Sequence, residues 1–94
     1  MGVDALAILR KAVLDQRYVL TEHAYDEMDD DNLDVLDIES AILTGALAQV
    51  LTDDPRGTRF VVHGKACDQS TSVAVVARCV EDGKVLVVTV YELE

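Results

Sequence analysis

Four residues in the C-terminal half of this chain carry side chains suited to acid-base chemistry on a phosphodiester: Arg59, His63, Arg78 and Tyr91. Cleavage of RNA through its 2′-hydroxyl requires a base for that proton, an acid for the leaving oxygen, and fixed positive charge on the phosphorane. A histidine can act as base or acid, a tyrosine as acid, and an arginine as the positive charge. The alternative is that the solvent face of an antiparallel sheet is polar in any protein, so these side chains need no catalytic purpose.

Alternation along two expected strands, at residues 58–64 and 84–91, decides whether these side chains meet. In the first strand, Arg59, Val61 and His63 point to one side. In the second, strict alternation puts Thr89 and Tyr91 on the same side as Val85 and Val87, opposite Leu86, Val88 and Val90. We expect one open face to hold Arg59, His63, Arg78, Thr89 and Tyr91. A single-residue bulge would reverse this partition.

The spacing of apolar residues predicts three helices followed by strands. The helices are expected over residues 5–16, from Thr21 to the acidic run at Asp29, and from Asp34 or Asp37 to residue 44. Asp4 and Thr21 stand at N-terminal cap positions, and Gly45 stands where a left-handed C-terminal cap would end the third helix. From residue 46 the pattern predicts strands at 46–52, 58–64, 71–80 and 84–91.

These elements predict one α+β domain over residues 1–94, with a helical part at 1–45 and a sheet part at 46–94. Three N-terminal helices would pack on a four-stranded antiparallel sheet. The Asp82-Gly83 pair between the last two strands predicts a tight hairpin, because a type I′ turn needs positive φ at its central residues.

His23, in the segment Thr21-Glu22-His23-Ala24, has two interpretations. In the functional one it is a site residue at a helix N-terminus. In the structural one its ring is half-buried and hydrogen-bonds a backbone group that fixes the start of the helix. Because helices and the open sheet face would lie on opposite sides, we do not expect His23 to meet His63.

The net charge of −10 is unevenly distributed. Residues 1–45 carry 11 acidic and three basic side chains, a balance of −8, and residues 46–94 carry the remaining −2. A negative field opposes encounter with nucleic acid, which is bound largely through Lys and Arg. The charge favours a basic protein partner for the acidic helices, and any polyanion would have to approach the C-terminal half.

We expect no metal or cofactor. Asp29-Asp30-Asp31-Asn32 lacks the Gly and Glu positions of a calcium loop and reads as a solvated acidic patch. Cys67 and Cys79 form no Cys-x-x-Cys pair and read as free thiols. No stretch approaches the roughly 20 apolar residues that span a bilayer, so we expect no membrane segment and a reducing cytoplasmic setting.

Several segments, in this order, resemble a bacterial family known as domain of unknown function 4258: Thr21-Glu22-His23-Ala24, Thr44-Gly45, Pro55-Arg56-Gly57 leading into Arg59-Phe60-Val61-Val62, and Val87-Val88-Thr89-Val90-Tyr91. The resemblance covers about residues 18–92. The family is similar in layout to RelE and ParE toxin domains, in which helices pack on an antiparallel sheet whose open face, in the nucleases, binds and cleaves messenger RNA on the ribosome.

The resemblance implies site roles for His23 on the helix, Tyr91 near the terminus and Arg59 after the turn. Around Met28, where the family usually has basic residues, this chain has Glu27 and Asp31. The resemblance, together with these acidic residues, therefore implies a weak or inactive messenger-RNA ribonuclease.

Two alternatives stay open beside the ribonuclease. One is a non-catalytic module that presents its acidic helices to a basic partner. The other is self-association into a homodimer through an edge strand at 71–80 or 46–52.

Overall fold

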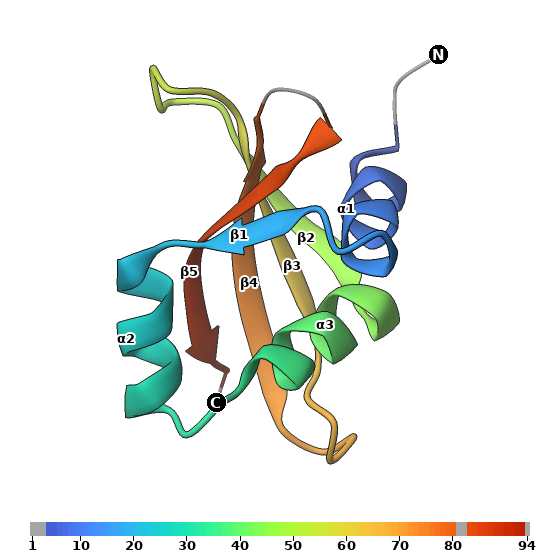
Figure 1. Ribbon diagram of the computed structural model, residues 1–94, viewed down its shortest axis with the longest axis vertical. Coiled ribbons are helices and arrows are strands. Elements are labelled where there is room, and N and C mark those ends of the chain that lie inside the picture. The colour runs from blue at the N-terminus through green and yellow to red at the C-terminus, as the bar shows by residue number, and fades with distance from the viewer. Residues whose placement is uncertain (1–3, 81–82, 94) are drawn as a thin grey trace.

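The computed structural model describes residues 4–80 and 83–93 (Figure 1). Within these ranges the chain forms three helices and five strands. In chain order they are α1 (Ala5–Leu14), β1 (Tyr18–Leu20), α2 (Glu22–Asp30), α3 (Val35–Thr44), β2 (Ala46–Leu51), β3 (Arg59–Lys65), β4 (Ser72–Cys79) and β5 (Val85–Glu92). The α+β class is confirmed, and the predicted boundaries of the longer elements agree with those observed to within one or two residues.

The described strands form one mixed sheet in the order β1-β5-β4-β3-β2. The pairs β2–β3, β3–β4 and β4–β5 are antiparallel, as expected. The prediction of four strands, all antiparallel and all after the helices, is wrong: β1 precedes α2 and pairs parallel to β5, with Val19 opposite Leu86. The prediction that 71–80 could be an edge strand is also wrong, because β4 lies between β5 and β3, whereas β2 is an edge.

Strand β1 was not predicted from the sequence, because a strand of three residues is too short to show an alternating pattern. Its position comes from tertiary contacts. The Tyr18 hydroxyl donates a hydrogen bond to the Glu39 carboxylate of α3, and burial together with that carboxylate raises the pKa of Tyr18. Leu20 is buried in the core, while Val19, between Tyr18 and Leu20, is exposed.

One face of the sheet packs against the helices around an aliphatic core. Helix α1 supplies Leu9 and α3 supplies Ile38 and Ile42, all fully buried. The sheet supplies valines from three strands, among them Val62, Val75 and Val87. Burying each such side chain stabilises the fold by about 1.5–3 kcal/mol. Helices α1 and α3 lie across this face, and α2 runs beside β5 (Figure 1).

A bulge in β5 changes the expected division between the two faces. The register moves from Val76 opposite Thr89 to Ala77 opposite Val87, so Val88 is an extra residue. Val85 and Val87 belong to the buried core together with Val90. The prediction that Val85 and Val87 share a face with Thr89 and Tyr91 is therefore wrong, although the opposition of Thr89 and Tyr91 to Val90 is correct.

The expected helix caps are present. Asp4 accepts hydrogen bonds from the backbone amides of Leu6 and Ala7. Asp34 and Asp37 form a reciprocal capping box at the start of α3. Each cap satisfies backbone N–H groups that the first helical turn leaves without a partner.

Gly45 is not a left-handed cap, because its backbone is extended, with φ −89° and ψ −170°. Close packing explains the glycine instead. A Cβ at Gly45 would lie 2.4 Å from the carbonyl oxygen of His63, and one at Gly64 would lie 2.0 Å from the carbonyl oxygen of Ala41. The two glycines let the end of α3 pack directly on the backbone of β3.

The hairpin between β4 and β5 is antiparallel, as the sequence predicted. Gly83 has the positive φ, 73°, that such a turn requires. Asp82, the other residue of the predicted turn, lies outside the described residues.

Gly64→Ala should lower the free energy of unfolding by about 1–3 kcal/mol, because the added methyl group meets backbone that cannot move aside as a side chain would. Gly83→Ala is the comparison: its Cβ meets nothing within 4 Å, so only the positive φ is penalised, at about 1 kcal/mol. Urea denaturation of both variants measures the difference. A Gly64→Ala variant as stable as the wild type would contradict the packing argument.

Candidate functional site

His63 and Tyr91 lie on the open face of the sheet in a single cross-strand row. His63 on β3 is opposite Ala74 on β4, and Ala74 is opposite Tyr91 on β5. Ala74 is fully buried although it is not part of the helix-covered core. The two larger side chains therefore lie on either side of a small side chain that is itself fully covered, with their Cα atoms about two strand spacings, or roughly 10 Å, apart.

An open depression of about 620 Å³ adjoins His63 at this end of the sheet. Its walls come from the end of α3, the start of β2, the end of β3, the start of β4 and Leu93. Lys65 lines it on the same side of β3 as His63, and its ammonium group donates a hydrogen bond to the Ser72 hydroxyl at 2.8 Å. The depression therefore carries an imidazole, an ammonium group and a hydroxyl.

Arg59 and Arg78 form a second row on the open face, where they are direct cross-strand partners. Val61 lies between Arg59 and His63 on β3 and is itself buried. Four residues of strand place the Cα atoms of Arg59 and His63 about 13 Å apart. The structure thus aligns His63 with Tyr91 in one row and pairs Arg59 with Arg78 in another. Thr89, opposite Val76, lies between the two rows.

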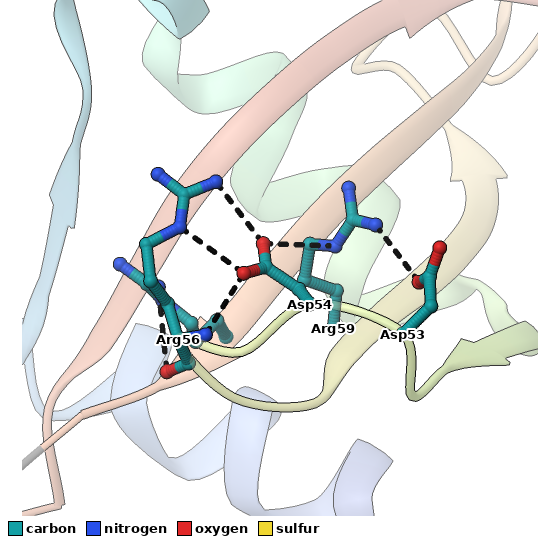
Figure 2. Close-up of polar contacts among 5 residues, drawn as sticks. Asp53, Asp54, Arg56 and Arg59 are labelled. Carbon is teal, nitrogen blue, oxygen red and sulfur yellow. Dashed lines mark hydrogen bonds and ion pairs between the residues drawn. The ribbon is translucent and has the colours of Figure 1, made fainter.

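Carboxylates of the loop between β2 and β3 hold Arg59 and the loop residue Arg56 (Figure 2). The Asp54 carboxylate lies between two guanidinium groups: it accepts hydrogen bonds of 3.1 Å from Nε and Nη2 of Arg56, and one oxygen is 3.6 Å from Arg59 Nε. Asp53 accepts a hydrogen bond of 3.3 Å from Arg59 Nη2. Hydrogen bonds from the Arg56 side chain and backbone lower the pKa of Asp54 to about 2.

Arg56, Arg59 and Arg78, together with Asp54, line a small pocket of about 90 Å³. Arg78 Nη1 donates a weak hydrogen bond of 3.5 Å to the Arg56 carbonyl oxygen. Arg59 and Arg78 fasten the loop to the sheet through their terminal nitrogens, while their buried Nε atoms are left without a hydrogen bond in the described residues.

His23 lies apart from both rows, on α2, as expected. Its side chain is 66% exposed and its Nε2 is 3.1 Å from a carboxylate oxygen of Glu27. The ring is thus neither half-buried nor bonded to a backbone group, and the structural interpretation given for His23 is wrong in that detail. Its neighbour Thr21 caps the helix by accepting from the backbone amide of Ala24 at 3.1 Å.

Two acidic residues of α2 and its C-terminal end complete the hydrogen bonding of β5. A Glu27 carboxylate oxygen accepts from the Val90 backbone amide at 3.3 Å, and an Asp31 oxygen accepts from that of Glu92 at 2.9 Å. Residues four apart on a helix are about 6 Å apart along its axis, close to the 6.6–6.8 Å between alternate amides of a strand. Within the predicted acidic patch, Asp31 is thus partly covered and has a structural contact, whereas Asp29 and Asp30 are exposed.

Sequence reasoning did not identify Lys65 or Ser72, and it named Glu27 and Asp31 without their structural role. Lys65 is two residues after His63 in the same strand, so the alternation that placed His63 on the open face also places Lys65 there. Glu27 and Asp31 are four residues apart, a helical spacing that indicates two carboxylates on one face of the helix without revealing that β5 lies beside it.

Other sites find little support. Among residues 4–80 and 83–93, no group of three or more His, Cys, Asp or Glu side chains is placed to hold a metal ion. Partial desolvation raises the pKa of the Cys67 thiol, with a further contribution from Asp37, and desolvation alone raises that of Cys79. Neither thiol is activated as a nucleophile. In the described part of the chain, no helix has the length and apolar character of a membrane span.

Glu27→Ala should lower the free energy of unfolding by about 1–3 kcal/mol, because it leaves the Val90 amide without a partner at a partly buried position. Asp26→Ala, an adjacent exposed carboxylate on the same helix, should change stability by less than about 0.5 kcal/mol. Thermal denaturation followed by circular dichroism compares them. Equal losses in the two variants would show that the Glu27 contact contributes nothing specific.

The stability of the wild type should fall as the pH drops from about 4 to 2. Asp54 has its pKa lowered to about 2 in the folded state, so its contribution is present above the unfolded-state value near 3.8 and is lost as the carboxylate becomes protonated. Asp54→Asn should flatten this part of the stability profile, whereas Asp26→Asn should leave it as steep as in the wild type. Urea titrations at several pH values supply the test, and profiles of equal slope for wild type and Asp54→Asn would contradict it.

Comparison with known proteins places the chain in a family. The model of the family described as "Domain of unknown function (DUF4258)" matches residues 20–92, from the end of β1 to the end of β5. No curated protein and no solved structure matches the chain. The match spans the Thr21-to-Ala24 motif, the loop between β2 and β3 and the row of His63 and Tyr91, and the chain belongs to the DUF4258 family.

Proposed function

We propose that this chain is a RelE-like domain that binds RNA on the open face of its sheet, in the cytoplasm, and cleaves it weakly. The observation that carries the proposal is the row in which His63 and Tyr91 flank the small side chain of Ala74. A phosphodiester bound above the covered Ala74 would have an imidazole on one side and a phenol on the other. These are the two groups that general acid-base cleavage requires.

In the proposed reaction, neutral His63 takes the proton of the 2′-hydroxyl, and the 2′-oxygen attacks phosphorus. Tyr91 donates its phenolic proton to the 5′-oxygen as the bond from phosphorus to that oxygen breaks. The products are a 2′,3′-cyclic phosphate and a free 5′-hydroxyl. Proton return from the imidazolium to the phenolate through solvent restores the site.

Lys65 is the cation best placed to stabilise the phosphorane. It lies two residues from His63 on the same side of β3 and lines the same depression. Arg59, the residue that family resemblance suggested, is four residues away and engaged by Asp53 and Asp54. We therefore assign Arg59 and Arg78 to holding the loop and to long-range attraction of phosphate.

The charge distribution supports weak RNA binding. Around the open face, the described carboxylates beside Arg56, Arg59, Lys65 and Arg78 are Asp53, Asp54 and Asp68, which leaves a local excess of one positive charge in a chain of net charge −10. Phosphate contacts contribute most of the non-specific affinity for nucleic acid. Local attraction opposed by the field of the whole chain predicts a high KM and low affinity.

A second candidate function is supported by α2. Its exposed acidic residues, Glu22, Asp26, Asp29 and Asp30, make no ion pair within the described residues. Charges left to solvent on one helix suit a basic protein partner, such as a neutralising protein bound to a toxin. This surface is separate from the His63 and Tyr91 row, so both functions are compatible in one molecule.

The purified chain should cleave a short single-stranded RNA without added metal, and His63→Ala and Tyr91→Phe should each reduce the rate about 100-fold or more. The chain supplies matched controls on α2: His23→Ala and Tyr25→Phe make the same chemical changes away from the row and should retain the wild-type rate. Induced expression in a bacterial host, with growth and transcript integrity followed for the first hour, tests the same chemistry in cells. Intact RNA in both assays would reject the ribonuclease and leave the acidic binding module.

A further inference from the structure

Strand β2 is an unprotected edge of the sheet. All of its residues from Ala46 to Val50 are exposed, and only Leu51 is partly covered. Its sequence, Ala-Leu-Ala-Gln-Val-Leu, contains no charged residue and no proline, the two features that commonly block pairing of an edge strand. Leu47 and Val50 are 38% and 47% exposed.

At the opposite side of the sheet, the backbone groups of β5 have partners. Strand β1 pairs with the first part of β5, and side chains of Thr21, Glu27 and Asp31 hydrogen-bond to backbone groups in the remainder of that strand. The chain thus satisfies one edge with its own side chains and leaves the other open.

A bulge in β2 arranges its side chains into two sets. The register moves from Leu47 opposite Val62 to Gln49 opposite Val61, so Ala48 is the extra residue. Leu47 and Val50, three residues apart, consequently lie on the same side of the sheet, opposite Val62 and Phe60. A bulge can protect an edge, but this one gathers the two exposed apolar side chains of the strand.

We propose that β2 pairs with β2 of a second copy of this chain, antiparallel, about a twofold axis between Ala48 and Gln49. In this register Leu47 faces Val50 of the second copy, and by symmetry Val50 faces its Leu47. Ala46 likewise faces Leu51. Such self-complementarity is what an isologous interface requires.

Charge also favours a second copy over a basic partner. A basic protein would be drawn to the exposed carboxylates of the helices, and β2 offers it none. Two copies of net charge −10 repel each other, and the uncharged strand lets them approach with no carboxylate in the paired segment.

The pairing would also join the two polar rows of the open face. In each copy Ala46 is opposite His63, and Leu51 is opposite Arg59. The row Tyr91, Ala74, His63, Ala46 would therefore continue into Leu51, Arg59 and Arg78 of the second copy. Three strand spacings, about 14 Å, would separate His63 of one copy from Arg59 of the other. The idea that the joined rows form one RNA-binding surface rests on the proposed function, whereas the pairing of the two β2 strands does not.

The test is sedimentation equilibrium of the full chain, without RNA, from about 10 µM to about 1 mM. The wild type should approach twice its monomer mass of 10.2 kDa. Val50→Lys places a charge at two symmetry-related positions of the interface and should raise the dimer Kd about tenfold or more. Val19→Lys is the matched control, because Val19 is an exposed valine, 55% accessible, on the other edge strand.

Circular dichroism establishes that each variant is folded, and Leu47→Lys replaces Val50→Lys should the latter unfold. A wild type that stays monomeric at 1 mM overturns the proposal, as does equal weakening by Val19→Lys and Val50→Lys. Loss of RNA cleavage leaves this result untouched, since the mass is measured without RNA. If cleavage is found, a specific activity that rises with wild-type concentration but not with Val50→Lys would support the composite surface.

Discussion

The outer edge of β5 is the constraint on which the rest of the fold depends. The strand is eight residues long, but β1 pairs with only the first three. A partly buried amide such as that of Val90 costs about 1–3 kcal/mol when it has no partner, so this part of the edge must be satisfied by something other than β1. Helix α2 does this with side chains: Thr21 at its start, Glu27 in its middle and Asp31 at its end. The position of α2 beside the sheet, and hence the path of the chain into α3, follows from these contacts.

The bulge at Val88 is linked to the same contacts. The Thr21 hydroxyl donates a hydrogen bond to the Val88 carbonyl oxygen at 3.0 Å while it accepts from the first turn of α2. One hydroxyl thus connects the helix cap to the extra residue of the strand. Because of that residue, β5 buries Val87 and Val90 and still turns Tyr91 to the open face. The row with His63 exists only because the strand departs from strict alternation.

Sequence reasoning succeeded where the signal is local. Cap residues such as Asp4 and Thr21, and apolar periods ten residues long, identified the helices and the longer strands. It failed where tertiary contacts decide: β1 is too short for a period, and the Val88 bulge leaves no composition signal. Gly45 illustrates a third limit, because a glycine required for close packing cannot be told by sequence from one required for positive φ. At the site, alternation correctly placed His63 and identified Arg59, but the carboxylates that engage Arg59 lie in a loop whose path it could not trace.

The acidic residues serve at least two physical purposes, and this changes what the net charge implies. Glu27 and Asp31 accept backbone hydrogen bonds, and Asp53 and Asp54 engage arginines, so these carboxylates have architectural roles. The exposed acids of α2 have no such partner within the described residues. The molecule is therefore electrically two-sided, with a modest positive excess around the open sheet face and an unpaired negative surface on the helices. A polyanion suits the first surface and a basic protein the second, so formal charge alone excludes neither partner, and their different locations allow each to be tested without disturbing the other.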